Sequence, residues 1–105
     1  MDSAPIKIKE IANLHGIDKI MEINLSKGTP SDKIPVSNNS HFVITKYSGG
    51  KFRFVFSVAT GETKSNMFAA DESIGKPIEI PKGYTFLHFE LVGESDAVFN
   101  CSLIS

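Results

Sequence analysis

The fold is decided by residues 84–104, YTFLHFELVGESDAVFNCSLI, in which apolar and polar side chains alternate on both sides of a polar break. A period of two is typical of a β-strand with one buried face. The break Glu94-Ser95-Asp96 suits a three-residue hairpin turn. In that hairpin the apolar rows pair as Leu91 with Phe99, Phe89 with Cys101 and Leu87 with Leu103, and both rows face one core.

A second stretch of the same kind is residues 41–60, HFVITKYSGGKFRFVFSVAT, which holds a glycine pair between two apolar runs. A three-residue turn would pair Ile44 with Phe54 and Phe42 with Phe56. A turn of Gly49-Gly50 alone would instead present the opposite side of the first strand. We favour the three-residue turn because it buries more apolar surface.

Residues 17–25 are another clear strand candidate with the same alternation. Shorter candidates are residues 64–69, 78–80 and 6–9, and single helical turns are allowed at residues 10–14 and 69–73. Seven or eight short strands without a long helix predict an antiparallel β-sandwich in a single domain, residues 1–105. Both an immunoglobulin-like and a jelly-roll-like topology fit, although tryptophan and a cysteine pair, which mark immunoglobulin domains, are absent.

Charge and hydropathy limit the classes of partner. Eleven basic and twelve acidic residues alternate without forming a block, and the formal net charge is −1. Nucleic-acid binding usually requires a basic stripe, so we expect no nucleic-acid partner. No apolar run approaches the length of a membrane span and no signal peptide is evident, so we expect a soluble protein whose compartment stays unassigned.

Catalytic and metal-binding patterns are missing from the sequence. It contains no Gly-x-Ser-x-Gly string, and His15, His41 and His88 are far apart and outside any ligand spacing. The single cysteine, Cys101, stands in an apolar stretch, which favours a buried and unreactive thiol. We therefore expect a protein that is not an enzyme and that needs no cofactor or metal.

The outward side of the predicted 84–104 hairpin carries less charge than a solvated sheet face normally does. Its candidate interface residues are Phe86, His88, Glu90, Val98, Asn100 and Ile104. Residues 61–76 or the N-terminal arm could cover them, which would make the surface structural. The function we expect is a structural or protein-interaction module that forms homo-oligomers or docks on a larger assembly.

A small carbohydrate-binding module is the alternative. Sugar sites combine an aromatic ring, which stacks on a pyranose, with amide and charged groups that bond its hydroxyls. The residues that supply these groups are Asn38, Asn39, Tyr47, Arg53 and Tyr84. Tryptophan, the strongest stacking residue, is absent.

Overall fold

The computed structural model describes residues 17–105, which form eight strands and one short helix. The elements are β1 (Ile17–Leu25), β2 (Ile34–Pro35), β3 (His41–Gly49), β4 (Phe52–Ser57), β5 (Thr63–Met67), α2 (Ala70–Ser73), β6 (Ile78–Glu79), β7 (Phe86–Leu91) and β8 (Ala97–Ile104). The helical turn predicted at 69–73 is confirmed as α2. The strand predicted at 6–9 and the turn at 10–14 lie outside the described residues. The sequence reading missed β2, which at two residues is too short to show a period.

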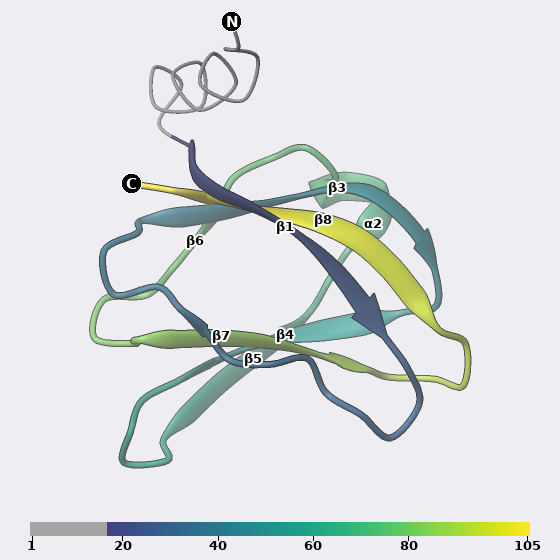
Figure 1. The fold of residues 1–105 in the computed structure, drawn as a ribbon, viewed down its shortest axis with the longest axis horizontal. Helices are drawn as coiled ribbons and strands as arrows, with labels where there is room; N and C mark the ends of the chain where they lie inside the picture. Colours follow the sequence, from purple (N-terminus) through teal and green to yellow (C-terminus); the bar gives the residue numbers. More distant parts are fainter. Residues whose placement is uncertain (1–16) are drawn as a thin grey trace, which may run out of the picture.

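The strands form two four-stranded antiparallel sheets that face each other across the core (Figure 1). One sheet has the order β1-β8-β3-β6 and the other the order β2-β7-β4-β5. The predicted all-β sandwich is thus confirmed. An immunoglobulin domain places its first two strands in one sheet, whereas β1 and β2 lie in opposite sheets here. The pairing of β1 with β8 and of β2 with β7 is the jelly-roll order.

Both predicted hairpins are wrong, because their two strands lie in opposite sheets. Phe89 of β7 is paired with Phe54 of β4, and Cys101 of β8 is paired with Ile44 of β3. The alternation predicted correctly which side chains face inward. It does not determine whether two inward-facing rows belong to neighbouring strands of one sheet or to opposite sheets that pack across the core. Phe89 and Phe99 meet across the core, with their ring centroids 5.0 Å apart.

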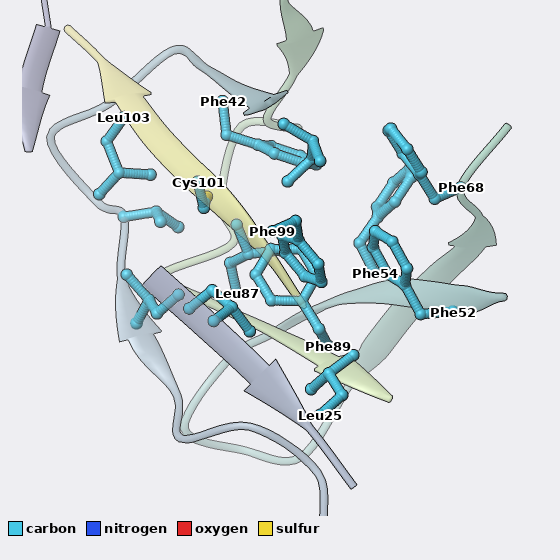
Figure 2. Packing of buried hydrophobic residues seen from close by; sticks show 14 of the residues in the cluster. Leu25, Phe42, Phe52, Phe54, Phe68, Leu87, Phe89, Phe99, Cys101 and Leu103 are labelled. Carbon is cyan, nitrogen blue, oxygen red and sulfur yellow. The ribbon is translucent and has the colours of Figure 1, made fainter. Parts of the chain in front are cut away.

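The core is formed by the inward rows of both sheets (Figure 2). Of the side chains predicted to be buried, only Leu91 is partly exposed; the rest are Phe42, Ile44, Phe52, Phe54, Phe56, Leu87, Phe89, Phe99, Cys101 and Leu103. Phe52 lies between two parallel rings, with its centroid 4.3 Å from that of Phe99 and 4.9 Å from that of Phe68. Phe68 directly follows β5, so the connection to α2 adds a ring to the core.

A β-bulge in β3 and a glycine turn shape one end of the sandwich. The bulge falls between Thr45 and Ser48, where Lys46 takes a φ of +53°. At Gly49, which has a φ of +111°, a Cβ would stand 2.2 Å from the carbonyl oxygen of Asp96. The β3–β4 turn therefore packs on the β7–β8 turn more closely than any residue with a side chain allows.

Candidate functional site

Each sheet turns one face outward, and the strand register assigns side chains to it. The β8 face, on the sheet of β1, β8, β3 and β6, consists of Ile20, Glu22, Asn24, His41, Val43, Thr45, Ser48, Glu79, Val98, Asn100, Ser102 and Ile104. The β7 face, on the other sheet, consists of Pro35, Arg53, Val55, Ser57, Thr63, Ser65, Met67, Phe86, His88 and Glu90. The two faces lie on opposite sides of the molecule (Figure 1).

The predicted interface residues do not form one surface. The prediction that all six lie on the outward side of a single hairpin is therefore wrong. Phe86, His88 and Glu90 lie on the β7 face, and Val98, Asn100 and Ile104 lie on the β8 face. All six point outward from their sheets, as predicted, and all six are partly exposed. The error is one of sheet membership, since the predicted hairpin placed β7 beside β8.

The β8 face is mostly aliphatic and hydroxylic. Ile20, Ser102 and Val43 form one row across β1, β8 and β3. Ser102 is only 8% exposed, whereas Ile20 is 55% exposed, the largest value among the exposed large apolar residues of the described chain. The charged residues that the register places on this face are Glu22 and Glu79, one on each edge strand. Exposed Lys46 lies in the same sheet, in the β3 bulge between Thr45 and Ser48, where the register assigns no partner. The face thus carries negative charge at its edges around a weakly polar centre.

The β7 face has a polar and aromatic character. His88 Nε2 lies 2.8 Å from Glu90 Oε2, and the side chains are 12% and 37% exposed. Lys33, just before β2, holds its Nζ atom 5.9 Å from the ring centroid of Phe86, which is cation–π distance. Val55, opposite His88, is buried although it points outward, so neighbouring side chains cover the middle of this face.

Arg53 lies on the β7 face next to a carboxylate with which it does not pair. Its cross-strand partner is Glu90, yet the carboxylate of Glu90 bonds His88 instead. Arg53 Nε, Ser57 Oγ and His88 Nδ1 are all buried and have no hydrogen-bond partner among residues 17–105. An unpartnered buried polar atom costs about 1–3 kcal/mol, and more when the group is charged. Three such atoms on one face are a feature that calls for an external partner or a rearrangement of side chains.

A recess of about 360 Å³ opens beside Arg53. Its other lining residues are Ser65, Asn66 and Met67 of the edge strand β5. Met67 is 49% exposed, so an apolar group stands next to hydroxyl, amide and guanidinium donors. This combination suits a carboxylate carried on an apolar stem.

One end of the sandwich holds a second recess, of about 290 Å³, between the β2–β3 and β6–β7 connections. Asn39, His41, Lys82 and Tyr84 are among its lining residues. The Tyr84 hydroxyl donates a hydrogen bond to Glu62 Oε2 at 3.2 Å. Desolvation raises the pKa of Tyr84, and the charge of Glu62 and its hydrogen bond raise it further. The phenol therefore keeps its proton and ties this connection to the β4–β5 turn.

The residues predicted for a carbohydrate site are spread over the molecule. Asn39 and Tyr84 share the recess between the two connections, and Asn38 is exposed in the same β2–β3 connection. Tyr47 instead packs on Phe52, with a centroid distance of 5.6 Å, and donates its hydroxyl proton to a turn carbonyl. Arg53 lies on the β7 face. Tyr47 is therefore a structural residue of the turn, and the set does not form one site.

Three residues that shape the outward faces were missed by sequence reasoning. Ile20 had a visible signal, since it is the apolar residue among Asp18, Glu22 and Asn24 on the polar side of the strand at 17–25. Lys33 had none, because β2 itself was not predicted. Met67 lies in the strand predicted at 64–69, but residues 61–76 were considered as a cover for the outward face, whereas Met67 is itself exposed on the edge strand β5.

In residues 17–105, no group of three or more His, Cys, Asp or Glu side chains is arranged to hold a metal ion. Within the same range, no helix has the length and apolar character to cross a membrane. Comparisons with protein-family models, with curated proteins and with solved structures found no match. A jelly roll by itself does not define a function, so the two outward faces are the features of this chain that bear on its function.

Proposed function

We propose that this protein is a non-enzymatic structural module that associates with copies of itself through its outward sheet faces. The observation that carries the proposal is the composition of the β8 face. Of the twelve described side chains that the register places there, only Glu22 and Glu79 are charged. In an antiparallel sheet with one face in solvent, the residues on that face are normally polar or charged. The centres of protein interfaces, in contrast, are depleted in charged residues.

The exposed Ile20 strengthens this proposal. Leaving an isoleucine side chain in water forfeits about 1.5–3 kcal/mol relative to full burial, and Ile20 is 55% exposed. Val43, Val98 and Ile104 add further partly exposed aliphatic groups to the same face. Association with a second copy would remove this apolar area from water.

The test is sedimentation velocity over a concentration series with the wild type and Ile20→Lys. We expect the wild type to show a concentration-dependent shift to larger species and Ile20→Lys to remain monomeric. Ile74→Lys is the matched control, because Ile74 is 40% exposed but lies in the β5–β6 connection. A wild type that stays monomeric at every concentration would overturn the proposal.

A small carbohydrate-binding module is the second candidate, supported by the recess that Asn39 and Tyr84 share. The expected ligand is a saccharide whose ring packs on Tyr84 and whose hydroxyls bond the polar lining. Saccharide titrations followed by NMR should then shift the amide signals of Gly83 and Tyr84, and Tyr84→Ala should abolish the shifts. A glycan array without a binder removes this candidate.

A further inference from the structure

We propose that the association is heterologous, with the β8 face of one copy docking on the β7 face of the next. This inference rests on the proposed self-association and adds which two faces meet and how their charges select each other. A heterologous contact uses two different surfaces, so each copy keeps one free face after docking. Assembly then continues into rings or open chains rather than stopping at a two-fold dimer.

The charges of the β8 face argue against docking on itself. Glu22 and Glu79 are the charged residues that the register gives this face, and both are exposed. Two β8 faces brought together would confront carboxylates with carboxylates. Juxtaposed like charges disfavour such a pairing and select another partner surface.

The β7 face has the complementary charge. Within the described residues, Arg53 makes no hydrogen bond or ion pair, and Lys33 makes no ion pair and lies over the ring of Phe86. The one carboxylate on this face, Glu90, is already bonded to His88. Two β7 faces would oppose arginine and lysine to their own copies, whereas a β8 face would supply carboxylates to both.

The shapes of the two faces agree with this pairing. The recess beside Arg53 is about 360 Å³ and is open to an incoming carboxylate side chain, while Met67 offers apolar contact beside it. The β8 face presents Glu22 two residues from the protruding Ile20 on β1. A carboxylate and an aliphatic side chain thus project together toward a guanidinium and a thioether.

The size of the faces limits the area that association can bury. Strands β2, β7, β4 and β5 have two, six, six and five residues, which at the usual spacing give the β7 face a projected area of about 300 Å². Stable complexes bury about 800 Å² on each partner, so this contact is weak and concentration-dependent. Because its charges are at the surface, raising the ionic strength should weaken it further.

The test uses charge reversal on each face, followed by mixing. Lys33→Glu alters the β7 face and Glu22→Lys alters the β8 face, and both side chains are exposed in the monomer. Each variant alone should associate about tenfold more weakly than the wild type, as expected when attraction becomes repulsion. Lys82→Glu and Glu72→Lys make the same changes in net charge away from both faces and should associate like the wild type.

The decisive sample is an equimolar mixture of Lys33→Glu and Glu22→Lys at low ionic strength. Each variant retains one wild-type face, so the mixture should form 1:1 heterodimers that grow no further.

Arg53→Gln tests the β7 face again should Lys33→Glu fail to fold, and circular dichroism verifies that each variant is folded. Association of Lys33→Glu and Arg53→Gln at wild-type strength, or a mixture no larger than its components, would overturn the heterologous contact. Self-association itself would still stand, since only a monomeric wild type removes it.

Discussion

The thiol of Cys101 lies on the inward side of β8, where its side chain is fully buried between apolar rows. Burial raises the pKa of this thiol from its ordinary value of 9.0 to about 12. Water is excluded there and the described structure gives the thiolate no positive neighbour, so the charged form is disfavoured. The sequence predicted this environment correctly, because a strand residue whose neighbours on the same face are all apolar is normally buried in the core.

The raised pKa makes Cys101 a source of alkaline sensitivity. The unfolded thiol ionises as the pH rises past its ordinary pKa, while the folded thiol keeps its proton. The folded state then binds more protons, so the stability from Cys101 is complete below pH 9.0 and is lost as the pH rises toward 12. The loss should approach about 1.4 kcal/mol per pH unit.

The measurement compares urea unfolding of the wild type with that of Cys101→Ala at a series of alkaline pH values. Other titrating groups are common to both proteins and cancel in the difference. The stability advantage of the wild type should be constant near neutral pH and should decline above pH 9.0. Two parallel stability curves would contradict the buried, protonated thiol.

At the scale of elements, alternation predicted most strands and their inward faces but not their partners. The strand at 17–25 has the predicted bounds, and β8 begins directly after the predicted turn Glu94-Ser95-Asp96. Phe89 buries the same ring whether its strand neighbour is Cys101 or Phe54, so local burial could not distinguish a hairpin from a crossover. Sheet partners depend on contacts between strands distant in the sequence, and period two contains no information about them.

The pairing of β1 with β8 can be tested by a disulfide. Met21 of β1 stands opposite Cys101, and directly opposed residues in antiparallel strands have Cα atoms about 4.5–5.5 Å apart. That separation lies within the range that a disulfide spans. Met21→Cys should therefore form an intramolecular disulfide with Cys101 on mild oxidation, measured as a loss of free thiol without dimer formation.

Phe89→Cys is the control for this pairing. The predicted hairpin would place that cysteine directly opposite Cys101, whereas the two sheets hold it across the core. Sheets that pack face to face are about 10 Å apart, which is too far for a disulfide without backbone movement. A disulfide in Phe89→Cys together with free thiols in Met21→Cys would support the hairpin over the jelly roll.

At the scale of the whole molecule, the sequence could indicate which residues point outward but not which outward residues share a surface. His88 and Asn100 are both outward and partly exposed, as predicted, yet they lie on opposite faces. Their separation follows from the strand order, which is a property of the complete chain. That Arg53 has no ion pair within the described part of the chain was equally unpredictable, since it depends on Glu90 bonding a histidine two residues away on its own strand.

The same strand order makes the last segment of the chain essential to the whole fold. β8 lies between β1 and β3 and is the only described strand that pairs with β1. A chain ending at Asp96 would lose Phe99, Cys101 and Leu103 from the core. Replacing even one large core side chain by alanine costs about 2–5 kcal/mol, whereas small domains are stable by about 5–15 kcal/mol.

We therefore expect the chain that ends at Asp96 to lack any cooperative unfolding transition, rather than to retain a partly stable second sheet. The remaining sheet of β2, β7, β4 and β5 would expose its whole inward row, including Phe52, Phe54 and Phe89, to water. Removal of exposed Ser105 alone is the control and should leave a sharp transition. Calorimetry and near-ultraviolet circular dichroism distinguish the outcomes. A truncated chain that still melts cooperatively would show that the second sheet is stable by itself, which its one-sided burial does not permit.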